Sequence, residues 1–591
     1  MSGRGRRMWL VVCALALVCG VWSWGEEYPR RSRVGEPDPQ ASASAERGGV
    51  LRDYLGPSPK SLNYYLDNNT MSATVLSMMY ESLIEMDLTL EYDRALACRW
   101  TISEDRREFV FWLDPKARWS DGRPVTAEDV KWTYDTIVDP RNMTGPHKLS
   151  LERFEKVEVV EGGKAVRCVA REVHWENLGA IGGMSVLPKH VFADKDFNRI
   201  NFEFPVVSGP YRIRELKEGF YLSMERRRDW WRAKWPSNRG RLNFDEIRYI
   251  FYEDQNNAFD AFLKGEIDVM QVYTARFWEK LEQRNEKVRK NWIVKQAIRN
   301  RAPIGFQGFA MNMRRPPFDD VRVRRAMAYL LDRPMINSTM MFNQYFLHRS
   351  YMEDLYDAEH PCRNPEYGFD VARACALLDE AGWRVNPATG IRERDGRPFR
   401  FTFLSRSGGA EKIITTYKTQ LEKVGIRMDI ASKDWSAWAK DMDSYNFDMT
   451  WAAWGAGVFK NPESLWLSSE AKRPGGNNIT GFADARVDEL IRRQRTLFDV
   501  RQRHELCRQI DAILCEQCPY VLLWNIDYTR LLYWNRFGMP RNVLGRYGRS
   551  DYVSLWWADE DAEALLEDAQ ASGEPLPARP AQVSVEDMLG K

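Results

Sequence analysis

The side chains that could do chemistry in this chain are scattered along it. The six histidines form no His-x-x-x-His pair that could hold zinc. No Gly-x-Ser-x-Gly turn, phosphate-binding Gly-Lys-Ser/Thr loop or dinucleotide fingerprint occurs either. The residue types therefore do not favour catalysis, and we expect no enzyme activity, no cofactor and no metal. The histidines are His147, His174, His190, His348, His360 and His504.

Cys515 and Cys518 have the Cys-x-x-Cys spacing of redox and zinc sites. A second pair at metal-finger spacing is missing, so this signal is weak. Ile510 and Leu514 lie on the apolar face of a helix that leads into the pair, which favours buried thiols. A disulfide within the pair or with Cys507, and a metal site, stay open as alternatives.

Strand and helix patterns alternate in the second half of the chain. Strands are predicted at Phe399–Leu404, Ile426–Ile430 and Phe447–Trp454, with helices at Glu411–Val424 and Trp435–Met442 between them. This order predicts a largely parallel sheet with helices on both faces. Ligands of such sheets bind beyond the carboxyl ends of the strands. The end of the third strand is therefore a candidate ligand site.

The first 25 residues have the pattern of an export signal. Residues 1–7 are basic, Trp9 to Val21 is apolar, and small residues lead to a cleavage site after Gly25. The apolar run is shorter than the ~20 residues that a membrane span needs. Cys19 leaves lipid anchoring open. The mature protein is expected outside the cytoplasmic membrane.

Length and charge narrow the class further. A chain of 591 residues exceeds one hydrophobic core, so we expect several domains. The formal net charge is +2, and removing the three arginines of the export signal leaves −1. A near-neutral mature chain has no general attraction to nucleic acid or anionic lipid, and we expect no nucleic-acid partner.

A series of motifs follows in order between residues 97 and 383. They are Ala97–Asp105, Glu108–Leu113, Ala117–Val130, Val207–Tyr211, Leu263–Asp268, Asn312–Ala326, Leu331–Arg333 and Leu377–Trp383. Together they resemble the family 5 extracellular solute-binding proteins of ABC importers, the peptide, nickel and opine class. The closing Leu555-Trp556-Trp557 resembles the YejA-like oligopeptide and microcin C branch.

The resemblance implies an α/β, two-lobed periplasmic-binding-protein fold of the class with an extra inserted domain. The ligand cleft would lie between the lobes, with a hinge. The implied division is 1–25 signal peptide, 26–47 flexible linker, 48–86 first segment of lobe 1 and 87–195 inserted domain, followed by 196–303 second segment of lobe 1, 304–525 lobe 2, 526–558 C-terminal segment of lobe 1 and 559–591 acidic, proline-rich tail. We expect that tail to form a short helix followed by disorder.

The same resemblance implies the ligand-binding residues. A cleft-lining loop of the first lobe would supply Asn68, Asn69 and Thr70, although turn formation explains these residues equally well. Ser208 matches a return into the first lobe near the hinge, where Gly209 would allow unusual backbone angles. The remaining implied residues are Asn312, Trp435, Trp454, Gly455, Ala456 and Gly457. Core packing is the competing interpretation for the tryptophans.

Gly457 departs from the pattern of peptide-binding relatives. They commonly carry an acid there, which pairs with the ammonium group of the peptide. Either Asp448, Glu463 or Asp434 substitutes for it, or the ligand is not an ordinary free-amine oligopeptide.

The expected function is therefore solute binding for an ABC importer. The expected solute is an oligopeptide or modified peptide held between the lobes, partly through main-chain groups. The alternative is an oligosaccharide or another small molecule, because tryptophan-rich clefts also stack on sugars. The expected partners are this ligand and the permease subunits in the cytoplasmic membrane, and we expect a monomer.

Overall fold

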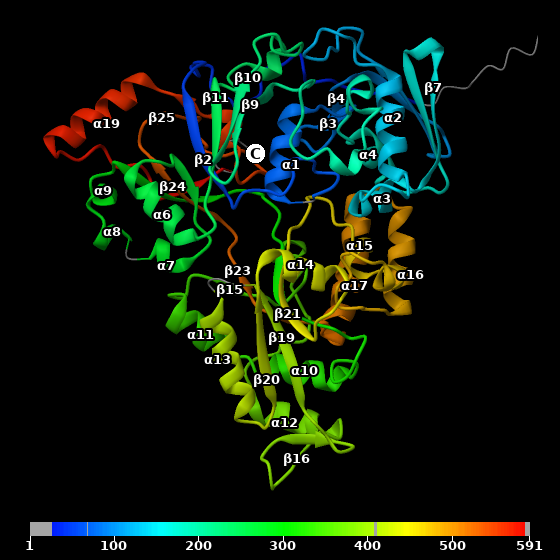
Figure 1. The fold of residues 1–591 in the computed structure, drawn as a ribbon, viewed down its shortest axis with the longest axis vertical. Helices are drawn as coiled ribbons and strands as arrows, with labels where there is room; N and C mark the ends of the chain where they lie inside the picture. Colours follow the sequence, from blue (N-terminus) through cyan, green and yellow to red (C-terminus); the bar gives the residue numbers. More distant parts are fainter. Residues whose placement is uncertain (1–25, 68, 280, 407–409, 586–591) are drawn as a thin grey trace, which may run out of the picture.

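The computed structural model describes residues 26–585, except Asn68, Lys280 and residues 407–409. The predicted export signal, with Cys19, lies outside the described residues. Two lobes are stacked along the long axis of the molecule, with the middle of the chain forming the lower one in Figure 1. Among the described residues, no helix is long and apolar enough to cross a membrane.

Lobe 1 is built on a mixed sheet of eight strands, in the order β27-β13-β24-β12-β2-β11-β10-β9. The strands are β2 (Val50–Gly56), β9 (Tyr211–Lys217), β10 (Tyr221–Arg226), β11 (Glu246–Phe251), β12 (Val269–Gln271), β13 (Ile293–Arg299), β24 (Thr529–Trp534) and β27 (Gln582–Ser584). Its helices are α1 (Thr70–Met79), α6 (Gln255–Lys264), α7 (Ala275–Trp278), α8 (Leu281–Arg284), α9 (Glu286–Arg289), α18 (Tyr552–Leu555) and α19 (Glu560–Ser572). β25 (Phe537–Gly538) pairs with β26 (Trp557–Ala558) beside this sheet.

The inserted domain has an antiparallel sheet in the order β1-β5-β6-β8-β7. One continuous apolar core joins it to lobe 1, since Phe111 and Val130 belong to the same cluster as Leu51 and Trp556. The strands are β1 (Glu26–Tyr28), β5 (Ala97–Ile102), β6 (Glu108–Leu113), β7 (Phe154–Val160) and β8 (Ala165–Ala170), with the hairpin β3 (Ile84–Met86) and β4 (Tyr92–Arg94). The helices are α2 (Ala127–Val138), α3 (Gly145–Leu151), α4 (Asn177–Gly182) and α5 (Lys189–Phe192).

Lobe 2 has a sheet in the order β20-β19-β21-β14-β22. The strands are β14 (Phe306–Met311), β19 (Arg400–Arg406), β20 (Arg427–Lys433), β21 (Met449–Trp454) and β22 (Tyr520–Leu522). The three strands predicted from the sequence are β19, β20 and β21, and they are parallel. β14 runs antiparallel to both of its neighbours, β21 and β22, so β22 points the same way as β19, β20 and β21. The sheet is therefore largely parallel, as predicted, with β14 as the exception.

Helices cover both faces of the lobe 2 sheet, as predicted. Phe309 and Phe403 pack into one core and Phe306 and Leu404 into another, the alternation expected of a strand buried on both sides. The helices are α10 (Val321–Tyr329), α11 (Arg333–Met340), α12 (Val371–Glu380), α13 (Glu411–Glu422), α14 (Trp435–Asp443), α15 (Glu463–Trp466), α16 (Ala485–Arg495) and α17 (Val500–Gln517). β15 (Phe346–Leu347) pairs with β23 (Trp524–Asn525), and β16 (Arg384–Val385), β17 (Arg392–Arg394) and β18 (Arg397–Pro398) form a hairpin-like tip.

Residues 26–47 do not form the predicted flexible spacer. Their first strand, β1, pairs with β5 of the inserted domain. Val34 and Gln40 are buried, and the Gln40 Oε1 atom accepts the Arg546 backbone N–H at 2.6 Å. The prediction was wrong because these contacts join residues far apart in sequence, which leave no local periodicity.

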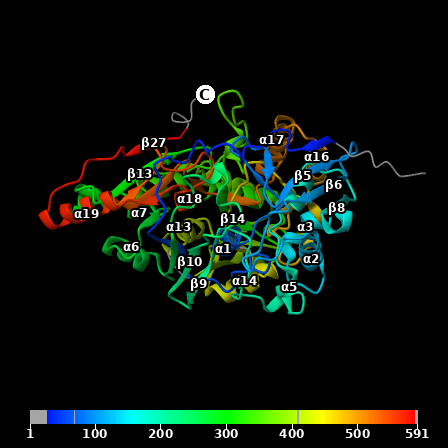
Figure 2. The same cartoon turned by 90° about the horizontal axis from the view of Figure 1, so that it is seen from above.

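The tail also differs from the prediction. Its helix is confirmed as α19, but the following chain is ordered through Val585, which is fully buried. β27 pairs in parallel with β13 at the edge of the lobe 1 sheet. Seen from above, α19 lies at the end of the molecule opposite β5, β6 and β8 of the inserted domain (Figure 2).

Cys515 and Cys518 are buried thiols, as the helix pattern indicates. Cys515 lies on α17 and Cys518 caps its end, each only 3% exposed. All seven cysteines within the described residues are free thiols, so no disulfide joins Cys507 to this pair. Those residues also contain no cluster of metal-ligating side chains.

Candidate ligand site

Three parallel strands of lobe 2 end at the same edge of its sheet. Arg406, at the end of β19, lies opposite Lys433, at the end of β20. Phe306, the first residue of antiparallel β14, pairs with Trp454, the last residue of β21. The segment 300–305, which leads from lobe 1 into β14, therefore reaches lobe 2 at the sheet edge where the sequence predicts the ligand site.

Lobe 1 presents the corresponding edge of its own sheet. Gln271, at the end of β12, pairs with Leu531, and Ile298 of β13 pairs with Thr529, the first residue of β24. β2 and β11 run parallel to β12 and end at this edge as well. Because short segments connect the two edges, the carboxyl ends of the parallel strands in both lobes face the space between them. Open α/β sheets bind ligands in this position.

Arg530 ties the lobes together beside the connecting segments. It is 1% exposed and belongs to β24 of lobe 1. Its guanidinium donates to the Gln344 carbonyl at 3.2 Å and to the Tyr345 hydroxyl at 3.3 Å, both in lobe 2. The Asn525 side chain donates to the Gly305 carbonyl at 2.8 Å. Sequence patterns gave no signal for the contacts of Arg530 or Asn525, because their partners are remote along the chain.

Trp454 and the three residues after it lie at this edge. The Trp454 Nε1–H donates to the Tyr520 hydroxyl at 3.0 Å, and its half-buried ring packs on the lobe 2 core. Gly455 and Gly457 are exposed, and Ala456 is half-buried between them. Backbone groups are therefore accessible directly beyond a fixed indole ring.

Lys460 occupies the surroundings of Gly457. It is 7% exposed, and its Nζ atom donates to the Gly457 carbonyl at 3.1 Å and to the Asp354 carboxylate at 2.6 Å. The Asp354 carboxylate also accepts the Ile304 backbone N–H at 3.1 Å, in the segment connecting the lobes. A buried cation thus stands beside the position where an ammonium-binding acid was missing. Sequence reasoning did not single out this lysine.

A cavity of about 670 Å³ lies where Val458 of lobe 2 meets lobe 1. Its size fits the range of small-ligand sites. Tyr80 and Trp230 contribute apolar walls. The charged lining consists of Arg33, Glu36, Asp38, Glu81, Glu85, Asp87, Asp93, Arg232, Arg241, Arg546 and Asp551.

The carboxylates of this cavity already have partners in the protein. Arg232 binds Glu81 at 3.2 Å and also binds Glu85. Three more carboxylates form ion pairs: Asp87 with Arg33 at 3.0 Å, Asp38 with Arg241 at 3.2 Å and Glu36 with Arg31 at 2.8 Å. The other two accept backbone N–H groups, Asp93 from Arg33 and Arg94, and Asp551 from Gly545 and Gly548. Each carboxylate of the described lining therefore already accepts at least one hydrogen bond or ion pair from the protein.

Ser208 is fully buried and lies behind the cavity wall. Its Oγ atom accepts the Glu81 backbone N–H at 2.9 Å, so it positions a residue of the lining. Gly209 has no left-handed backbone. A Cβ atom there would lie 2.3 Å from the Met78 carbonyl, so close approach to α1, rather than hinge bending, requires glycine.

The other predicted residues lie in different places. Asn312 is buried at the opposite edge of the lobe 2 sheet, where its amide donates to the Tyr445 and Phe447 carbonyls. Asn69 caps α1 by accepting the Ser72 N–H at 2.8 Å. Thr70 is exposed at the start of α1, and Trp435 is the first residue of α14, directly after the carboxyl end of β20. Asn68 and the Trp435 side chain lie outside the described part of the chain.

Of the three acids that could substitute for the missing carboxylate, only Asp434 is exposed at the sheet edge that carries the predicted site. It caps α14 by accepting the Ala437 N–H at 2.9 Å and is exposed. Asp448 precedes β21 and so lies at the far end of the strand, where it accepts the Thr402 N–H. Glu463 is buried against His174 and Arg495.

Gly305→Ala should lower the free energy of unfolding by about 2–3 kcal/mol. A Cβ atom at this position would lie 1.9 Å from the Trp454 carbonyl oxygen, so the end of β21 must move. Gly455→Ala is the matched control, because a Cβ atom there meets nothing within 4 Å. Urea unfolding measures both variants. Equal stability of the two would show that the close approach is not required.

Comparison with known proteins matches this architecture. The model of the bacterial extracellular solute-binding proteins, family 5, matches residues 91–475. The chain is 29% identical over 523 residues to a putative binding protein of Brucella melitensis, covering 81% of this chain and 83% of that protein. It is 27% identical over 563 residues to the probable peptide-binding protein YejA of Agrobacterium fabrum, covering 88% and 90%.

Among solved structures, the oligopeptide-binding protein AppA of Bacillus subtilis, in complex with a nonapeptide, superimposes with a TM-score of 0.75. That match has 22% sequence identity and covers 87% of this chain and all of AppA. A family model that matches most of the chain, together with the two-lobed fold, defines the class. The protein belongs to family 5 of the bacterial extracellular solute-binding proteins.

Proposed function

We propose that the protein is the extracytoplasmic solute-binding component of an ABC importer, and that it binds an oligopeptide or modified peptide between its lobes. The observation that carries this proposal is the shared edge. The carboxyl ends of the parallel strands in both lobes face the same space, where Trp454 stands beside exposed backbone at Gly455 and Gly457. An extended peptide can pair with such backbone while its side chains enter neighbouring space.

The proposed site consists of Asn69, Thr70, Asp434, Trp435 and residues 454–457. The cavity beside Val458 would take a ligand side chain or end group. Ser208 and Asn312 are left out, because both are buried and bonded within their lobes. The bound protein would deliver its ligand, as a monomer, to permease subunits in the cytoplasmic membrane. Export would end in cleavage after Gly25 or in lipid attachment at Cys19.

Mass spectrometry of the solute released from protein purified under native conditions tests the proposal. Short peptides, with or without a modification, are the expected result, in keeping with AppA and with the peptide complex of DppA from Helicobacter pylori. A sugar or a metal complex as the only stoichiometric solute would overturn it.

The ligand is further proposed to be recognised without strong use of a free amino group. Gly457 has no side chain, Lys460 places a cation beside it, and Glu463 and the cavity carboxylates already accept bonds from the protein. Asp434 is exposed, but its carboxylate already caps α14. A charge-assisted hydrogen bond contributes about 1.5–3 kcal/mol, so its absence weakens free-amine peptides by about 10–100-fold.

Gly457→Asp should therefore improve the affinity for penta-alanine relative to its N-acetylated form, while the wild-type protein should bind the two almost equally. Gly457 is not left-handed, so its backbone angles allow the change. A Cβ atom there would lie 3.1 Å from the Phe459 carbonyl oxygen, which must shift by a few tenths of an ångström. Calorimetry with both peptides decides the matter. A strong preference of the wild-type protein for the free amine would contradict it and would point to Asp434, which Asp434→Asn then tests.

A further inference from the structure

The inserted domain contacts lobe 2 through a buried histidine and a buried glutamate. His174 and Glu463 lie 289 residues apart in sequence, and each is 1% exposed. The His174 Nε2 and Glu463 Oε1 atoms are 2.7 Å apart, and Arg495 donates to the same carboxylate from α16 at 2.8 Å. Figure 1 shows α15, α16 and α17 at the top of lobe 2, below the inserted domain.

Neighbouring groups extend this contact. The Trp175 backbone N–H donates to the Arg495 carbonyl at 2.8 Å, and its indole N–H donates to Gln494 at 3.0 Å. The Arg503 guanidinium lies 4.2 Å from the centre of the Trp175 ring. This interface joins the inserted domain to lobe 2 at a position remote from the segments that connect the lobes. Breaking it should therefore allow the two lobes to move apart.

The hydrogen bonds of His174 fix its protonation. Its Nδ1 atom accepts the Glu176 backbone N–H at 3.0 Å, so the ring hydrogen is on Nε2 and is donated to Glu463. Burial lowers the pKa of His174, against the opposing effect of the bond to Glu463. Burial also raises the pKa of Glu463, but the bond from His174 and the charge of Arg495 outweigh it and hold that pKa at about 2.

The charges that face His174 balance one another. The inserted domain supplies Glu172, Glu176 and Arg153, α15 supplies Glu463, α16 supplies Arg495, and α17 supplies Arg503. With a neutral histidine, three carboxylates stand against three arginines. A proton added to Nδ1 would face the Glu176 backbone N–H at 3.0 Å, so protonation would break this hydrogen bond and push the two groups apart, although the bond from Nε2 to Glu463 would remain.

We propose that His174, Glu463 and Arg495 form a latch that holds the inserted domain against lobe 2, and that acidification opens it. The latch acts on lobe closure whatever the solute, so this inference goes beyond the proposed function. An open state would expose His174, where its pKa returns to about 6.5.

The sign of the pH dependence follows from this difference. The closed state binds the proton less tightly than the open state, so closure is fully favoured above pH 6.5 and weakens as the pH falls below it. The equilibrium constant for closure should fall by up to about tenfold per pH unit in that range.

Small-angle scattering on the ligand-free protein tests the latch independently of peptide binding. The wild-type radius of gyration should be larger at pH 5.5 than at pH 7.5. His174→Phe should be expanded at both values. His174→Gln should stay compact at both, because the glutamine amide still donates to Glu463 and does not titrate. Arg492→Ala, which removes an exposed ion pair with Glu489 on α16, should behave as the wild type does.

A wild-type radius that is independent of pH, or a compact His174→Phe, would overturn the proposal. A pH dependence that persists in His174→Gln would assign it to another group and would also overturn it. Circular dichroism verifies that each variant is folded. If His174→Phe does not fold, Glu463→Gln gives a second test. Loss of this charge leaves Arg495 only its 3.4 Å ion pair with Glu172 and should expand the protein at both pH values.

Discussion

Asp511→Leu should lower the free energy of unfolding by about 4 kcal/mol or more. Asp511 is fully buried on α17 and accepts hydrogen bonds from the Ser350 hydroxyl at 2.7 Å, the Tyr351 N–H at 2.8 Å, the Tyr356 hydroxyl at 2.7 Å and the Asn364 amide at 2.6 Å. Leucine has the same branched shape but accepts none of these hydrogen bonds. Each buried donor left without a partner costs about 1–3 kcal/mol.

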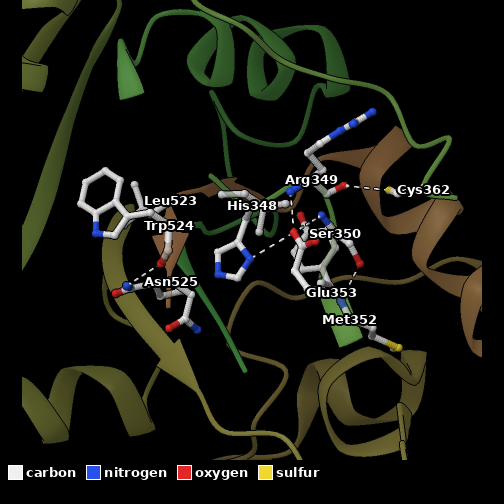
Figure 3. A network of polar contacts seen from close by, with 12 residues as sticks. His348, Arg349, Ser350, Met352, Glu353, Cys362, Leu523, Trp524 and Asn525 are labelled. Atoms are coloured by element: carbon white, nitrogen blue, oxygen red, sulfur yellow. Dashed lines mark hydrogen bonds and ion pairs between the residues drawn. The ribbon is translucent and has the colours of Figure 1, made fainter. Parts of the chain in front are cut away.

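This carboxylate matters for the site because of the turn that it holds. Figure 3 shows the segment from His348 to Glu353, in which the Glu353 carboxylate accepts the N–H groups of Arg349 and Ser350 at 2.6 and 2.9 Å. Asp354 follows directly and binds Lys460. Loss of Asp511 should therefore also loosen the buried cation beside Gly457.

Two variants separate the buried network from a general effect on the helix. Asp511→Asn keeps one acceptor oxygen and should cost about 2 kcal/mol. Asp499→Ala, at the exposed N-cap of the same helix, should cost about 1 kcal/mol. Urea unfolding of the three variants should show the largest loss of stability for Asp511→Leu, a smaller loss for Asp511→Asn and the smallest for Asp499→Ala. A cost for Asp511→Leu no greater than that for Asp499→Ala would contradict the prediction.

The strand ends of lobe 2 could be predicted from the sequence, because they depend on local patterns. The alternation before Trp454 and the helical spacing before Gly425 identify β21 and α13 to within two residues. Chain order then places Trp435 and Trp454 at one edge, since parallel strands end together. The two-lobed arrangement and the inserted domain were predicted only from the family resemblance.

The remaining parts of the site could not be predicted, because they depend on contacts between remote residues. Lys460 meets Asp354 over 106 positions, and His174 meets Glu463 over 289. A buried lysine and an exposed one look alike in a sequence. Asn312 was predicted to bind the ligand because it lies in a family motif. In the structure its side chain instead donates to two backbone carbonyls of its own lobe.

Asp53→Asn should raise the free energy of unfolding at pH 8 by about 2–4 kcal/mol and leave it almost unchanged near pH 4. Asp53 is 1% exposed in the middle of β2. Burial raises its pKa from 3.8 to about 7, although hydrogen bonds from the Tyr54 N–H and the Tyr552 hydroxyl oppose this rise. Such a rise corresponds to about 4 kcal/mol between the two protonation states.

The direction follows from proton binding. The folded state holds the Asp53 proton more tightly than the unfolded state, so its contribution is fully present below pH 4, falls as the pH rises and is lost above pH 7. Asparagine stays neutral throughout and keeps an oxygen for the Tyr54 and Tyr552 bonds. The difference in unfolding free energy between variant and wild type, measured in urea from pH 4 to 8, should grow across this range. Tyr552→Phe removes an opposing bond and should move the pH dependence to higher pH. A difference that is constant with pH would show that Asp53 does not titrate there, and that the core of lobe 1 holds a charged carboxylate at neutral pH.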